Sequence, residues 1–115
     1  MDNQLAIERI PANNAIEIRV AGRLDFARSA QMEEAIRQEF EHRNLRIIMN
    51  LNGVEFISSA AIRVLVKYYK EAKSASGFLV VAQPSQAVTS ALNMVGLSAL
   101  YARPVLVNKK VESMD

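Results

Sequence analysis

Near the start of the chain, apolar and polar residues alternate with the two-residue period of a β-strand. Residues 15–20 (AIEIRV) set isoleucine and valine against glutamate and arginine, which predicts a strand with one buried face. Residues 5–10 (LAIERI) also favour a strand, and the PANN sequence at 11–14 is typical of a turn. The pattern therefore predicts an antiparallel hairpin at the N-terminal end.

The next segments change from a helical to a strand pattern. Within residues 29–43, apolar side chains recur at Met32, Ile36 and Phe40 while charged residues lie off that stripe, which predicts an amphipathic surface helix. Residues 45–51 (LRIIMNL) contain consecutive apolar side chains, which is typical of a strand buried on both faces. A helix followed by a buried strand is the beginning of an α/β arrangement.

A turn, a helix and another strand are expected after that buried strand. The NGVEF sequence at 52–56 is interpreted as a turn, and a helix is predicted from about Ser59 to about Lys73. Residues 77–82 (GFLVVA) form a further apolar strand. This repeats the strand–helix–strand order of the preceding segment.

The last helix is predicted to open at Pro84 and Ser85. Its apolar residues follow the i, i+3, i+4, i+7 spacing, and Gly96 is a natural C-terminal stop. Residues 104–107 (PVLV) suggest a short edge strand, and residues 108–115 a tail or a single helical turn.

The element order predicts a single α/β domain over residues 1–107. Two strand–helix–strand units in series imply parallel strands joined by right-handed crossovers, and the hairpin adds an antiparallel edge. The expected fold is a mixed, mostly parallel sheet of four to five strands with three or more helices. A length of 115 residues fits one domain.

Composition excludes several classes of function. The net charge of +2 is too small and scattered to indicate a nucleic-acid-binding protein. There is no cysteine and only one histidine, His42, so we expect no disulfide, metal site or cofactor. The N-terminus lacks the pattern of a signal peptide, and no apolar stretch approaches the roughly 18 residues of a membrane span. We expect a cytoplasmic protein that is a monomer or a weak dimer.

Four polar residues follow the predicted parallel strands. Asp25 comes after the second strand, Ser58 and Ser59 after the third, and Ser85 after the fourth. In open α/β sheets, functional contacts gather beyond the carboxyl ends of the strands. The element order alone therefore predicts that these residues share one edge of the molecule.

The two adjacent serines have a structural and a functional interpretation. Either Ser58 or Ser59 can cap the helix that follows, by accepting a hydrogen bond from its first turn. Alternatively, one hydroxyl receives a phosphate, because a helix N-terminus tolerates added negative charge. The local pattern leaves both interpretations open.

A basic row is predicted on the helix below Ser59. Arg63, Lys67 and Lys70 follow it at helical spacing. The row is either an ordinary solvated face or a surface that docks an acidic partner. The residues that we expect to face the core instead are Ile62, Leu65, Val66, Tyr69 and Ala72.

Catalysis is not indicated by the sequence. A serine nucleophile needs a nearby general base, and His42 lies at the far end of another helix. The chain contains neither a G-x-S-x-G elbow nor a phosphate-binding glycine-rich loop. We therefore expect a protein that is acted upon by an enzyme and is not one itself.

The sequence NLNGVEFISSAAIRVLV at 50–66 resembles the central signature of the STAS domain, the sulfate-transporter and anti-sigma-factor-antagonist family. VAGRLDF at 20–26 is similar to the G-x-L-D segment of that family, and residues 77–101 resemble its final strand and helix. The resemblance covers nearly the whole chain. It implies a STAS-like fold.

The resemblance also implies functional residues. Ser59 matches the serine that is phosphorylated in anti-sigma factor antagonists, Ser58 being a less favoured acceptor, and Asp25 matches an acidic residue on the partner-binding edge. Unphosphorylated antagonists bind an anti-sigma factor, often a serine kinase, and so free a sigma factor; a phosphatase reverses the modification. The complete set expected to contact the partner is Asp25, Ser58, Ser59, Arg63, Lys67, Lys70 and Ser85.

Two residues depart from the family pattern. Asn50 stands where aspartate is frequent at the strand end, and Ala61 where glycine is frequent after the serine. We expect the methyl group of Ala61 to narrow the approach to the helix start and change which partner fits.

Three functions follow from these observations. The first is an anti-sigma factor antagonist, a binding module switched by phosphorylation. The alternative is a constitutive STAS subunit of a transport or other multiprotein complex, without phosphorylation. A serine hydrolase is the third, and it would require ester turnover that disappears in the Ser59→Ala variant.

Overall fold

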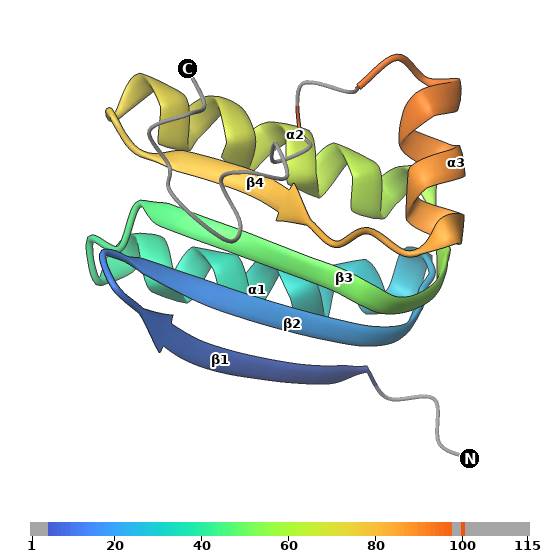
Figure 1. Cartoon of the computed structure of the whole chain (residues 1–115), viewed down its shortest axis with the longest axis horizontal. Helices are drawn as coiled ribbons and strands as arrows, with labels where there is room; N and C mark the ends of the chain where they lie inside the picture. Colours follow the sequence, from blue (N-terminus) through green and yellow to red (C-terminus); the bar gives the residue numbers. More distant parts are fainter. Residues whose placement is uncertain (1–4, 98–99, 101–115) are drawn as a thin grey trace.

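The computed structural model describes residues 5–97 and residue 100 (Figure 1). Its elements follow one another in the order strand, strand, helix, strand, helix, strand, helix. They are β1 (Ala6–Ala12), β2 (Ala15–Leu24), α1 (Phe26–Glu41), β3 (Arg46–Ile57), α2 (Ser59–Ser74), β4 (Phe78–Ala82) and α3 (Gln86–Met94).

The four strands form one sheet in the order β1-β2-β3-β4. β1 and β2 pair antiparallel across a tight turn, whereas β2 with β3 and β3 with β4 pair parallel. The predicted α/β class, the mixed sheet and the N-terminal hairpin are therefore confirmed. The two parallel pairs are joined through α1 and α2, as the strand–helix–strand units required.

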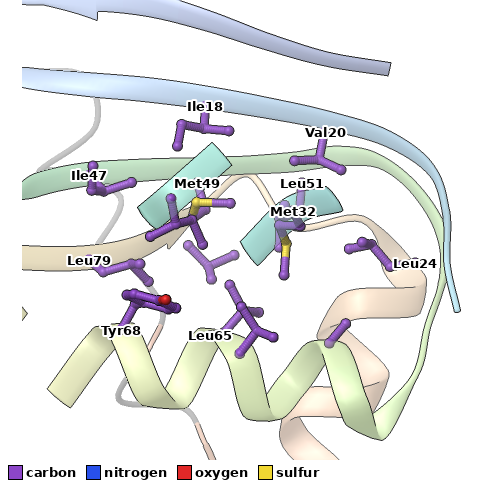
Figure 2. Packing of buried hydrophobic residues seen from close by; sticks show 14 of the residues in the cluster. Ile18, Val20, Leu24, Met32, Ile47, Met49, Leu51, Leu65, Tyr68 and Leu79 are labelled. Carbon is purple, nitrogen blue, oxygen red and sulfur yellow. The ribbon is translucent and has the colours of Figure 1, made fainter. Parts of the chain in front are cut away.

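The core lies between the sheet and the helices α1 and α2. Alternate residues of β2 point into it, because successive side chains of a strand face opposite sides of the sheet. Figure 2 shows side chains from β2, β3 and β4 meeting those of α1 and α2 in one cluster. Its labelled members are Ile18, Val20, Leu24, Met32, Ile47, Met49, Leu51, Leu65, Tyr68 and Leu79.

The third strand is longer than the sequence predicts. The predicted turn at residues 52–56 is wrong. β3 runs on to Ile57 and stays paired with the second half of β2. The register of this pair shifts twice, and Gly53 approaches Ala21 so closely that an added Cβ would lie 2.7 Å from the Ala21 Cβ. The extra length carries the start of α2 to the end of β2.

Helix boundaries agree closely with the expectations, with one exception. α1 begins at Phe26, three residues before the predicted start at 29. α2 covers residues 59–74, and α3 ends just before Gly96, whose φ of +74° suits a helix terminus. The predicted strand at 104–107, the tail at 108–115 and the division after residue 107 lie outside the described residues. Among the helices that are described, none is long and apolar enough to cross a membrane.

Candidate functional site

Three of the predicted site residues are helix N-caps. The side chains of Asp25, Ser58 and Ser85 each accept a hydrogen bond from the backbone N–H three residues further on, at 2.9, 3.2 and 3.2 Å respectively. Each cap residue has extended backbone angles, as an N-cap requires. The caps explain why a polar residue stands at each of these strand ends.

Ser59 has a different environment from Ser58. It is the first residue of α2, its side chain is exposed, and its hydroxyl has no hydrogen bond within the described part of the chain. The first turn of α2 contains no acidic residue. The N-cap of α2 is therefore Ser58, which the sequence alone could not decide. The Ser59 hydroxyl is accessible to another protein.

The structure brings Asp25 and the two serines together. The backbone N–H of Ser58 donates to the carbonyl of Leu24 at 2.8 Å, so the starts of α1 and α2 are neighbours. The N–H of Ser85 donates instead to the carbonyl of Leu51 at 3.3 Å, several residues before β3 ends. Ser85 therefore attaches α3 to a different part of β3, and its hydroxyl is used within its own helix.

An open groove of about 530 Å³ begins at Ser59 and runs along α2. Its other side is formed by the segment that follows α3, which stands at the same end of the molecule as the start of α2 (Figure 1). The floor is largely apolar. The lining residues are Ser59, Ile62, Arg63, Val66, Lys67, Lys70, Val95 and Leu97.

The predicted core face of α2 needs correction. Leu65 and Ala72 are buried as expected, whereas the three other residues predicted to face the core are only half-buried and pack at its margin. These three are Ile62, Val66 and Tyr69. The buried residues that the sequence interpretation did not assign to this face are Ala61 and Val64.

Ala61 does not act on the partner edge in the way expected. Its side chain is fully buried, so its methyl group packs into the core and does not narrow the approach to the start of α2. Its backbone N–H is the donor that Ser58 caps. The departure from the family glycine is therefore a packing difference.

In the basic row of Arg63, Lys67 and Lys70, the middle residue forms an ion pair with α1. Lys67 Nζ donates to Glu33 Oε2 of α1 at 3.1 Å, and the Tyr68 hydroxyl donates to the same oxygen at 3.1 Å. These contacts lower the pKa of Glu33, with the hydrogen bond from Lys67 as the largest cause, and raise the pKa of Lys67. Arg63 and Lys70 are exposed and have no ion pair among the described residues.

Two exposed aromatic residues border the same edge and were not recognised from the sequence. Phe26 follows the cap Asp25 and is 78% exposed, and Phe56 near the end of β3 is 39% exposed. The Arg23 guanidinium lies 4.6 Å from the centre of the Phe56 ring. Phe26 lies off the apolar stripe of α1, and this spacing could have indicated from the sequence that its side chain is exposed. Phe56 was not recognised because residues 52–56 were predicted to form a turn.

Groups that could hold a metal ion are absent from the described residues, where no cluster of three or more histidine, aspartate or glutamate side chains occurs. The Asp25 carboxylate is occupied by its capping bond and by an ion pair with Arg28. The edge thus offers exposed apolar side chains, a free hydroxyl and cations, which suits the binding of another protein.

Comparison with known proteins gives concordant results. The sequence model of the STAS domain matches residues 6–113. An anti-sigma factor antagonist from Mycobacterium paratuberculosis has a TM-score of 0.82 and 18% identity, with 100% of this chain and 98% of that chain covered. The anti-sigma factor antagonist SpoIIAA in its unphosphorylated form has a TM-score of 0.76 and 19% identity, with coverage of 96% and 99%.

A third structure is that of the phosphorylated form of the Bacillus cell fate determinant SpoIIAA. It has a TM-score of 0.69 and 18% identity, and 96% of this chain and 100% of that chain are covered. At these identities the structural likeness concerns the fold.

Proposed function

Because this chain belongs to the STAS domain family, we propose that it is an anti-sigma factor antagonist, a binding module without catalysis of its own. In the unphosphorylated state it binds an anti-sigma factor that is also a serine kinase, and so frees a sigma factor for transcription. Phosphorylation of Ser59 by that kinase releases the complex, and a phosphatase restores it. The cycle takes place in the cytoplasm and involves neither nucleic acid contact nor a cofactor of this chain.

The observation that carries this proposal is the contrast between the two serines. Ser58 has a structural task as the cap of α2, whereas Ser59 presents an exposed hydroxyl with no partner in the described residues. A kinase needs a hydroxyl that it can reach. Ser59 supplies it without loss of the cap.

The position of Ser59 also makes a phosphate tolerable to the fold. A phosphoserine carries a charge of about −1.5 to −2 at neutral pH. At the first residue of α2 this charge meets the positive end of the helix dipole, and no acidic residue of the first turn opposes it. The modification therefore changes the binding surface and leaves the domain folded.

The surface that the partner contacts is centred on the starts of α1 and α2. Its exposed aromatic residues Phe26 and Phe56 are natural anchors, since aromatic side chains dominate binding energy at interfaces. Besides these two aromatic residues, we assign Asp25, Ser58, Ser59, Arg63, Lys67 and Lys70 to the contact, with Lys67 acting from its ion pair with Glu33. Ser85, which the sequence analysis placed in the same contact, begins a different helix beside an earlier part of β3, and we do not assign it to the contact.

The test is phosphate incorporation by the cognate serine kinase, which we expect to be a GHKL-type enzyme whose gene neighbours that of this protein. We expect that wild type and Ser58→Ala are labelled, whereas Ser59→Ala is not labelled but still binds the kinase. Phosphopeptide mass spectrometry identifies the acceptor. Labelling of Ser58 or Ser85 with Ser59 untouched would show that the assignment is wrong.

A further inference from the structure

The groove along α2 has an apolar floor and a rim of positively charged side chains. Ile62 and Val66 supply the floor from α2, and Val95 and Leu97 supply it from the segment after α3. Val95 is 54% exposed, so it extends the apolar surface of the groove to solvent. The apolar surface extends beyond the groove at Met94, which is 82% exposed.

Among the described residues, the ionisable side chains that line the groove are all cations. They are Arg63, Lys67 and Lys70, and no described aspartate or glutamate lines it. Lys67 is neutralised by Glu33 of α1, but Arg63 and Lys70 have no ion pair in the part of the chain that the structure describes. The uncompensated charge therefore lies along the rim, one helical turn or more after Ser59.

We propose that this groove binds an acidic amphipathic helix of the partner protein. The apolar side of such a helix would cover the floor, and its carboxylates would pair with Arg63 and Lys70. This inference rests on the proposed function and identifies the chemistry of the partner segment.

Charge complementarity favours a segment of another protein over the remainder of this chain. Residues 101–115 contain three basic and two acidic residues, so they do not complement a cationic rim. An acidic helix does, and its attraction to the rim would also increase the rate of association.

The groove connects Ser59 with release of the partner. Arg63 is four residues after Ser59, the spacing at which helical side chains meet. A phosphate on Ser59 would take Arg63 as its own partner and would repel the carboxylates of the docked helix. Phosphorylation thus removes an attraction and adds a repulsion in the same groove.

The experiment is a titration of the full chain into a fluorescein-labelled 18-residue peptide, followed by fluorescence anisotropy. The peptide carries leucine at i, i+3, i+4 and i+7 positions with glutamate beside them, and a matched peptide carries lysine in place of glutamate. We expect saturable binding of the acidic peptide only. Arg63→Glu and Val95→Asp should each weaken it about tenfold or more, because each removes one component of the groove.

Lys73→Glu is the matched control, since it makes the same charge change on α2 outside the groove. It should change the affinity by less than about twofold. The absence of binding up to about 1 mM peptide, or equal effects of Lys73→Glu and Arg63→Glu, would overturn the proposal.

Two other occupants are tested in parallel. The first is an anionic lipid surface, tested with phosphatidylcholine vesicles that contain phosphatidylserine. If the wild-type chain binds these vesicles but not the peptide, and the Val95→Asp variant no longer binds the vesicles, the groove is assigned to lipid and the proposal is overturned. Sedimentation showing a dimer that Val95→Asp dissociates would assign it to a second copy and overturn it also.

The outcome is distinguishable from failure of the proposed function. The peptide titration tests the groove without any kinase. Labelling of Ser59 tests the proposed function and does not depend on what the groove binds. If Ser59 is labelled and Val95→Asp binds the kinase as wild type does, the groove assignment fails while the proposed function stands.

Discussion

Ser58 and Ser59 are adjacent residues with the same side chain and different physical tasks. The Ser58 hydroxyl accepts the N–H of Ala61, whereas the Ser59 hydroxyl points to solvent without a hydrogen bond in the described residues. The sequence could not separate them, because either serine satisfies the requirements of an N-cap. The extended backbone angles of Ser58 and its capping bond identify it as the N-cap, and its backbone N–H also donates to the Leu24 carbonyl at the end of β2.

Removal of the two hydroxyls should therefore have unequal effects on stability. We expect Ser58→Ala to lower the free energy of unfolding by about 1 kcal/mol, the usual cost of losing an N-cap. Ser59→Ala should change it by less than about 0.5 kcal/mol, since no hydrogen bond is lost. Urea unfolding followed by circular dichroism measures both. Equal destabilisation by the two substitutions would contradict the assignment of Ser58 as the cap.

At the scale of elements, a buried carboxylate attaches the edge strand β1 to α1. Glu39 is 6% exposed and accepts hydrogen bonds from Arg9 Nη2 of β1 at 3.3 Å and from Asn44 Nδ2 at 2.9 Å. Burial alone would raise the pKa of Glu39, but the hydrogen bonds from Arg9 and Asn44 outweigh it and lower the pKa. The ionised form therefore stabilises the packing of β1 on the rest of the molecule.

This attachment should weaken in acid. Because the pKa of Glu39 is lowered on folding, its contribution is complete above the unfolded pKa of about 4.3 and is lost as pH falls through the folded value. We expect Glu39→Gln to cost about 2 kcal/mol at pH 7. The difference from wild type should shrink below about pH 4.

The matched control is Glu8→Gln, which removes one negative charge from an exposed position of β1. Its effect should be small at every pH, and urea unfolding between pH 3 and 7 compares the three proteins. A difference between wild type and Glu39→Gln that is independent of pH would show that ionisation of Glu39 does not stabilise the fold.

Element boundaries were predictable where local chemistry decides them. The limits of α2 and α3 follow from a serine cap and an apolar period, and both helices lie where the sequence places them. The end of β3 was not predictable from its own residues, because an NG pair is typical of a turn. Continued pairing with β2 keeps Gly53 in the strand, and only the three-dimensional register reveals this.

For the whole molecule, element order was sufficient to predict the sheet and the adjacent starts of α1 and α2. The groove was not predictable, because its two sides come from α2 and from the segment after α3. The ion pair between Lys67 and Glu33 joins two helices and was equally hidden. Contacts between elements that are distant in the sequence thus complete the surface that we propose as the partner contact.

Phosphorylation of Ser59 as a release signal is tested by calorimetric titration of the anti-sigma factor with the full chain, either unmodified or stoichiometrically phosphorylated at Ser59. A kinase-inactive form of the anti-sigma factor keeps the modification state constant during the titration. We predict that the phosphorylated chain binds about tenfold more weakly or worse, because the phosphate brings a charge of about −1.5 to −2 into the contact. Equal affinities for the two forms would contradict a phosphorylation switch at Ser59.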